Sequence, residues 1–206
     1  MSQPEPGTGR VPRVLVVYGT TEGQTRDVAC RVAELARAAG AEAEFVHSAE
    51  AGTHLSQPWD GVIVGASVHQ GHHQTAVRAF VMANLPRLQS LPSAFFSLSL
   101  SAAAADPARR DEALGYIEAF LAETGWRPDA TLSLGGALRR AEYGPYEQLV
   151  LDMLGYQLGD GTVVPNDADY TDWGGVERFV GEFLALLAHA ATAPRAQLPA
   201  APQLRR

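Results

Sequence analysis

Lysine is absent from this sequence of 206 residues, and its 16 basic residues are all arginine. This absence excludes the lysine of a phosphate-loop NTPase, a pyridoxal Schiff base and any other catalytic lysine. Cysteine occurs once, as Cys30, so no disulfide can form within the chain, which fits a reducing compartment. Cys30 falls among apolar residues at helical spacing, and we therefore expect a small core residue rather than a reactive thiol.

Long hydrophobic runs and a positive net charge are also missing. The most apolar stretch, residues 94–105, is too short and too rich in serine to span a bilayer, which needs about 20 apolar residues. The N-terminal segment has no apolar core of a signal peptide. The net charge of -7 disfavours nucleic acid as a partner, because phosphate backbones repel an acidic chain. We expect a cytoplasmic protein with no transmembrane segment and at most weak peripheral contact with the inner face of the membrane.

What the sequence does contain is an alternation of strand and helix patterns. Hydrophobic residues make up 46% of the chain, enough for a sizeable core. Short, β-branched apolar runs predict strands buried on both faces. These strands are 13–18, 43–47, 61–65, 94–98 and 131–134. Apolar residues at helical spacing predict the connecting helices. These helices are 25–39, 75–87, 107–124 and 173–190.

This order of elements predicts an α/β fold with a doubly wound, five-stranded parallel sheet of order 2-1-3-4-5. The domain would span residues 13–190, between a flexible tail at 1–12 and a disordered tail at 191–206. Residues 139–172 exceed what the plain fold needs and form an insert. Ligands of such sheets bind at the carboxyl ends of the strands, beside strand 1.

The loop after the first strand is therefore the first candidate site. Its hydroxyls and backbone N–H groups open a helix N-terminus, which favours an anion. It lacks a Lys and the G-x-G-x-x-G pattern, so a monophosphate fits better than a triphosphate or a dinucleotide. The alternative is an ordinary helix N-cap by Thr25 with no ligand. The residues predicted to bind the phosphate are Thr20, Thr21, Glu22, Gly23, Gln24 and Thr25.

This loop resembles that of flavodoxins, which runs Ser/Thr-x-Thr-Gly-x-Thr, with Glu22 in place of the inner Thr. Over residues 13–190 the chain is similar to the flavodoxin-type, menaquinone-dependent protoporphyrinogen oxidases of bacteria, which tolerate an acidic residue there. The matching segments are Gly23-Gln-Thr-Arg-Asp27, Val64-Gly-Ala-Ser-Val-His-Gln-Gly-His72, Pro92-Ser-Ala-Phe-Phe-Ser97, Trp126-Arg-Pro-Asp129, Gly136-Ala-Leu-Arg139 and Tyr170-Thr-Asp-Trp173.

The resemblance implies a flavodoxin-like fold, FMN as cofactor and a two-electron dehydrogenation of protoporphyrinogen IX in haem biosynthesis. A tetrapyrrole would be the substrate and a quinone the electron acceptor. Two alternatives remain on the same scaffold, namely another FMN-dependent quinone reductase and a flavodoxin-type electron carrier without a substrate of its own.

In a flavodoxin-like sheet, the loops after the third and fourth strands would bracket the isoalloxazine ring. Their backbone amides and Ser hydroxyls would bind the ring's polar atoms; the alternative is a pair of ordinary surface loops. Neither segment carries an acid, and His is the sole ring-bearing residue in them, which predicts two-electron behaviour. The predicted residues are Ser67, Val68, His69, Gln70 and Gly71 in one loop, and Ser97, Leu98, Ser99, Leu100 and Ser101 in the other.

Three histidines, at 69, 72 and 73, raise the question of a metal site. No carboxylate or Cys near them completes a ligand set, so no metal is predicted. Handling of a proton near the flavin, or plain exposure to solvent, is the preferred interpretation.

The insert poses a separate question about membranes. Residues 146–158 have the pattern of an amphipathic helix that covers the flavin or meets a quinone-bearing membrane, or that simply packs on the core. Residues 139–172 contain two Arg against seven Asp and Glu, so we expect weak binding to anionic lipid. After the insert, Thr171 or Asp172 would cap the last helix and Trp173 would anchor it by packing.

Overall fold

The computed structural model describes residues 10–20, 23–104, 106–139 and 167–192. The helix expected at 146–158 and most of the expected tails therefore lie outside the described residues. At the tail boundaries, Pro12 O accepts from Glu42 N at 2.9 Å and residues 191 and 192 are helical, so the ordered part is slightly longer than expected at both ends.

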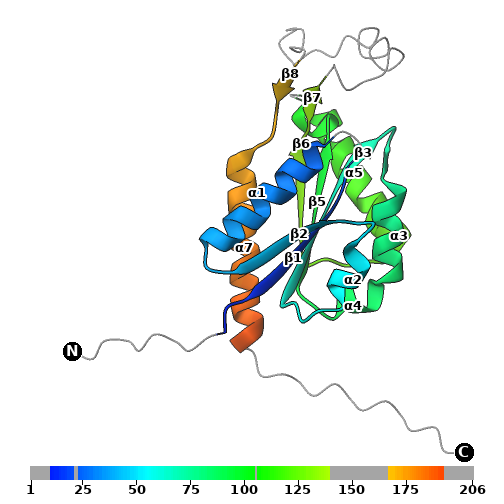
Figure 1. Ribbon diagram of the computed structural model, residues 1–206. Helices are drawn as coiled ribbons and strands as arrows, with labels where there is room; N and C mark the ends of the chain where they lie inside the picture. The colour runs from blue at the N-terminus through cyan, green and yellow to red at the C-terminus, as the bar shows by residue number, and fades with distance from the viewer. Residues whose placement is uncertain (1–9, 21–22, 105, 140–166, 193–206) are drawn as a thin grey trace, which may run out of the picture.

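The main sheet contains five parallel strands in the order β2-β1-β3-β5-β6 (Figure 1). The register places Val17 beside Val46 on one side and beside Val64 on the other, so β1 is an interior strand between β2 and β3. The doubly wound topology predicted from the sequence is thus confirmed. The strands are β1 (Arg13–Gly19), β2 (Glu42–His47), β3 (Gly61–His69), β5 (Ser93–Ser99) and β6 (Ala130–Gly135).

Helices cover both faces of this sheet (Figure 1). Val14 and Val16 belong to one core cluster, shared with α1 (Gln24–Ala38) and α7 (Trp173–Thr192). Leu15 and Val17 belong to the other, shared with the remaining helices. A strand that alternates between two apolar faces reads as a continuous apolar run, which is the pattern seen in the sequence. The helices on the second face are α2 (Ala51–Leu55), α3 (Thr75–Ala83), α4 (Leu85–Gln89) and α5 (Pro107–Thr124).

The single helix predicted over 75–87 is wrong, because the chain forms α3 and α4 there. Asn84 leaves helical geometry, with φ -115° and ψ 14°, and its side chain donates to Phe80 O at 2.8 Å. Pro86 has no N–H to continue the ladder of α3, so it starts a new helix instead.

The loop predicted through His73 is instead a β-hairpin. Strand β4 (His72–His73) pairs antiparallel with the end of β3, Val68 facing His73 and His69 facing His72. Gln70 and Gly71 form the turn, with φ of 50° and 80°, the positive values that a tight two-residue hairpin requires. In the insert, β7 (Ala137–Arg139) and β8 (Asp167–Asp169) form a second antiparallel pair.

Two expectations about single side chains are also corrected. Cys30 is only half-buried, and its Sγ lies 3.8 Å from Glu34 Oε1 on the outer face of α1. Trp173 is 39% exposed, so packing does not anchor α7 through this ring. Asp172 caps that helix as expected, since its Oδ1 accepts a hydrogen bond from Gly175 N at 2.9 Å.

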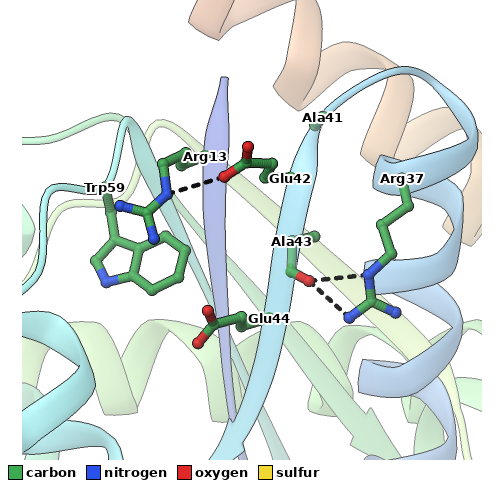
Figure 2. Close-up of a pocket in the computed structure, with 7 residues that line it drawn as sticks. All are labelled: Arg13, Arg37, Ala41, Glu42, Ala43, Glu44 and Trp59. Carbon is green, nitrogen blue, oxygen red and sulfur yellow. Dashed lines mark hydrogen bonds and ion pairs between the residues drawn. The ribbon is translucent and has the colours of Figure 1, made fainter. Parts of the chain in front are cut away.

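Strand β2 forms one edge of the main sheet, and a hollow runs along it (Figure 2). Arg37 reaches across from α1 and donates to Ala43 O from Nε at 2.9 Å and from Nη2 at 2.6 Å. Arg13 pairs with Glu42 at 3.2 Å and lies over the Trp59 ring, 4.6 Å from its centroid. The hollow lies beside the amino-terminal half of β1, away from the edge where the ligand is expected.

Within the described residues, no helix combines the length and apolar character needed to cross a membrane.

Candidate functional site

The carboxyl ends of three neighbouring strands bring the predicted segments together. Gly19, the last residue of β1, pairs with Ala66 on β3, and Ser67 on β3 pairs with Leu98 on β5. The β1–α1 loop, the β3–β4 hairpin and the turn after β5 therefore lie along one edge of the sheet. This is the edge that the sequence predicted for the ligand.

The β1–α1 loop is closed by a hydrogen bond between Thr20 and Gly23. Gly23 N donates to Thr20 Oγ1 at 2.8 Å, and Gly23 adopts a φ of 87°, which favours glycine. Thr21 and Glu22 lie outside the described residues. Gly23 occupies the N-cap position of α1 and Thr25 lies inside the helix, so the N-cap interpretation of Thr25 is wrong.

Thr25 is fully buried, and its Oγ1 has no hydrogen-bond partner among the described residues. A buried hydroxyl without a partner costs about 1–3 kcal/mol, so such groups call for an explanation. Ser48 Oγ and Tyr170 Oη are also buried atoms without a hydrogen-bond partner among the described residues. Ser48 follows β2 directly, and Tyr170 contacts Gly135 at the end of β6. All three residues thus lie at the carboxyl edge of the sheet.

These residues fit a phosphate group. Thr25 offers a hydroxyl in the first turn of α1, where the backbone N–H groups and the helix dipole favour an anion. The Thr20 hydroxyl accepts from Gly23 N and keeps its own hydrogen to donate.

Gln24 directs its side chain away from this loop. Its Nε2 donates to Thr171 Oγ1 at 3.1 Å, which ties the start of α1 to the segment before α7. A role of Gln24 in the site would therefore rest on its backbone, and it stays a prediction.

The β3–β4 hairpin is held to β3 by Gln74. Gln74 Oε1 accepts from Ser67 N at 3.1 Å, and Gln74 Nε2 donates to Ser67 Oγ. Val68 and His69 are half-buried residues of the β3 strand, and Gln70 and Gly71 are exposed at the turn. The hairpin is consequently a preformed wall of the site.

His73 is the histidine of the three that packs against aromatic core residues. Its Nε2 lies 2.8 Å from Ser97 Oγ, and its ring packs edge-on against Phe95 and Phe120, with centroids 5.3 and 4.9 Å away. Burial, with a smaller contribution from His72, lowers the pKa of His73 to about 4. His73 is thus uncharged at neutral pH in this structure.

The segment 97–101 is less loop-like than expected, because Ser97, Leu98 and Ser99 belong to β5. Leu98 is buried in the core, so only its backbone can face a ligand. Ser99 Oγ accepts from Ala102 N at 3.2 Å. Ser101 Oγ donates to Glu112 Oε2 at 2.9 Å, in the short helix η1 (Ser101–Ala103) that follows Leu100.

Glu112 and Tyr116 on α5 are part of this region, although the sequence analysis missed them. Tyr116 OH donates to Glu112 Oε1 at 2.8 Å, and a Cβ built on Gly71 would lie 3.8 Å from Tyr116 Cε1. Hydrogen bonds from Tyr116 and, to a smaller extent, from Ser101 lower the pKa of the Glu112 carboxyl. Burial and, to a smaller extent, the hydrogen bond with Glu112 raise the pKa of the Tyr116 hydroxyl. Their i, i+4 spacing on a predicted helix was the available signal. A carboxylate therefore does lie at the turn after β5, although the segment itself contains none.

Among the residues that the structure describes, no three His, Cys, Asp or Glu side chains come together as metal ligands.

Comparison with known sequences gives a family match over most of the chain. The family model described as Flavodoxin domain matches residues 15–162. The protoporphyrinogen IX dehydrogenase [quinone] of Escherichia coli K12 is 31% identical over 174 residues, which cover 84% of this chain and 96% of the relative. A protein of the same name from Leishmania major is 28% identical over 85% of this chain and 76% of the relative.

Comparison with solved structures supports the fold. A short-chain flavodoxin associated with a PDU bacterial microcompartment superposes with a TM-score of 0.52 at 12% identity. The superposition covers 88% of this chain and all of the flavodoxin.

Proposed function

The chain belongs to the flavodoxin domain family and, within it, to the protoporphyrinogen IX dehydrogenases [quinone], and on this premise we propose that it binds FMN and oxidises protoporphyrinogen IX to protoporphyrin IX. The oxidation removes six electrons and six protons in three two-electron steps, and a quinone would accept two electrons and two protons in each step, so that three quinones become three quinols. The observation that carries the cofactor assignment is the position of three residues whose buried hydroxyls have no hydrogen-bond partner within the described part of the chain. Thr25, Ser48 and Tyr170 all lie at the carboxyl edge of the sheet.

FMN supplies an acceptor for two electrons and a proton, which no side chain of this protein provides. The chain's own residues bind and orient it. Thr20, Thr25 and the N-terminus of α1 would hold the phosphate, and Thr21, Glu22 and Gly23 would complete that loop. The β3–β4 hairpin and the turn at Ser99–Ser101 would flank the ring, mainly through backbone groups.

The runner-up is an electron carrier without a substrate of its own. The Glu112 carboxylate at the turn after β5 is the observation that favours it, because negative charge near the ring opposes an anionic reduced flavin. Against it stands the sequence of the two flanking segments, which contain no acid and no Phe, Tyr or Trp. A ring that these two segments do not cover with an aromatic side chain would have room for a broad, flat tetrapyrrole, so we favour the enzyme.

An anaerobic assay tests the proposal. FMN-loaded protein is mixed with protoporphyrinogen IX and a menaquinone or ubiquinone analogue, and protoporphyrin IX is followed by its fluorescence. We expect turnover that depends on both the quinone and the bound flavin. Rapid reduction of the flavin by an electron-donor protein, with no protoporphyrin formed above the rate of flavin-free protein, would favour the carrier.

The membrane contact is tested separately with vesicles. Because residues 139–172 carry two Arg and seven acids, we expect little co-sedimentation with anionic vesicles at physiological salt. Co-sedimentation of most of the protein would instead support the membrane-binding interpretation of residues 146–158.

A further inference from the structure

Gln74 holds Ser67 by two atoms at once. Its Oε1 accepts from Ser67 N at 3.1 Å, and its Nε2 donates to Ser67 Oγ. The orientation of this amide follows from chemistry, because a backbone N–H can only donate and must face the carbonyl oxygen. The NH₂ end therefore faces Ser67 Oγ, and the serine oxygen acts as the acceptor.

The side chain of Gln74 is directed to β3 and does not cap the helix that it precedes. Gln74 is the N-cap residue of α3, and its backbone O accepts from Val77 N at 3.1 Å, but its side chain makes no capping bond. Gln is also not among the residues that cap helices well. The side chain instead spans the hairpin from α3 back to β3.

Ser67 is placed beside the phosphate loop. Ala66 pairs with Gly19 at the end of β1, so Ser67 lies one residue further toward the carboxyl edge. Side chains alternate along a strand, so Ser67 shares a face with Ile63, which packs in the cluster formed with α1. That is the face from which the N-terminus of α1 approaches the edge.

We propose that Gln74 is a positioning residue that presents the Ser67 hydroxyl as a hydrogen-bond donor to the flavin phosphate. Since Ser67 Oγ already accepts from Gln74, its hydrogen remains free to donate, and an anion needs donors. The proposal rests on the proposed function, because it assumes that FMN occupies this edge.

The test separates FMN from riboflavin, which has the same ring and no phosphate. Gln74→Met keeps the length of the side chain and removes both hydrogen bonds to Ser67. Loss of a well-placed hydrogen bond to a charged group predicts a fall in FMN affinity of roughly tenfold. Riboflavin affinity should change by less than about twofold, on the same free-energy scale. Both affinities are measured by fluorescence quenching with apoprotein.

Two further variants fix the cause. In a Ser67→Ala background, Gln74→Met should add no further loss of FMN affinity, because the residue acts through Ser67. Gln89→Met is the matched control, since the exposed Gln89 makes one hydrogen bond to Gly125 O, remote from the site. It should leave both affinities unchanged.

Specific outcomes would overturn the proposal. One is an equal loss of FMN and riboflavin affinity in Gln74→Met, which indicates a merely structural hairpin contact. Another is full additivity with Ser67→Ala. If circular dichroism shows that Gln74→Met is unfolded, Gln74→Glu takes its place, because the carboxylate still accepts a hydrogen bond from Ser67 N. This variant should again lower the affinity for FMN more than the affinity for riboflavin. Wild-type apoprotein that binds neither flavin would overturn the proposed function itself, whereas normal FMN binding by Gln74→Met overturns this inference alone.

Discussion

The two ends of the candidate flavin site differ in how their polar groups are satisfied. At the phosphate end, Thr25 has a buried hydroxyl with no partner among the described residues. At the ring end, side chains are already bonded to one another, as in His73 with Ser97. Ser101 likewise donates to Glu112.

This difference separates two ways of building a binding site. A group left without a partner lowers the stability of the empty protein and regains that free energy when a ligand binds. A side chain bonded within the protein rigidifies the wall and leaves the backbone to meet the ligand. We therefore expect mutations at the phosphate end to act on affinity, and mutations at the ring end to act on the stability of the fold.

The largest effect is expected from the triple change Thr20→Val, Thr21→Val and Thr25→Val. It removes three hydroxyl donors, each worth roughly 1.5–3 kcal/mol when bonded to a charged group. FMN should be lost on dialysis, and titration should show affinity reduced by roughly a thousandfold or more. Retention of the yellow colour at wild-type affinity would show that the phosphate binds elsewhere.

At the ring end, the buried His73 predicts a dependence of stability on pH. Its pKa is lowered to about 4 in the folded protein, against 6.5 for the ordinary group, so the unfolded chain binds the proton more readily. Stability should fall as pH drops from 6.5 to 4, with a contribution of about 2 kcal/mol between pH 7 and pH 5. Urea unfolding at both pH values measures it.

The control for this measurement is His73→Gln, which stays neutral and can still bond Ser97. The pH-dependent part of the unfolding free energy should shrink in this variant. An unchanged pH profile would assign that dependence to other groups.

The change Thr25→Val on its own should move stability and affinity in opposite directions. Valine has nearly the same shape and removes a buried hydroxyl that lacks a partner, so the apoprotein should gain about 1 kcal/mol. FMN affinity should fall roughly tenfold. Thermal unfolding of the apoprotein measures the change in stability, and flavin titration of the same variant measures the change in affinity. A loss of apoprotein stability would contradict the absence of a hydrogen-bond partner for this hydroxyl.

The smallest effect is expected from Ser101→Ala. Its hydroxyl donates to Glu112, which is exposed enough for water to replace the serine. FMN affinity should change by less than about threefold, corresponding to well under 1 kcal/mol. A loss comparable to that of Thr25→Val would mean that the two ends do not differ as described.

Much of the fold was predictable because local patterns agree with the global topology. The apolar run Arg13–Tyr18 predicted the interior strand β1. Asp106 with Pro107 predicted the start of α5, where Asp106 accepts from Ala108 N at 3.0 Å. The β3–β4 hairpin escaped prediction because strand β4 has only two residues, too few for a periodic pattern. The break at Asn84 was missed because the apolar spacing continues across it.

The candidate site was predictable in its segments and not in its side-chain partners. The loop at Thr20–Thr25 stands out by position and composition. Glu112 could not be assigned to the turn after β5 from sequence spacing alone, since its bond to Ser101 depends on how α5 docks. The same holds for the packing of the half-buried His73 of β4, which depends on Phe95 and Phe120 from two different elements.

The guanidinium of Arg37 bears on how this protein behaves at high concentration (Figure 2). An edge strand exposes carbonyl and N–H groups that a strand from another molecule can pair with, and this pairing is a common route to aggregation. Arg37 occupies the outward Ala43 carbonyl with two N–H groups, and Glu42 and Glu44 place negative charge along the same edge. A second copy would have to displace the arginine and bring like charges together before its strand could add, so β2 ends the sheet and resists its continuation into a neighbouring molecule.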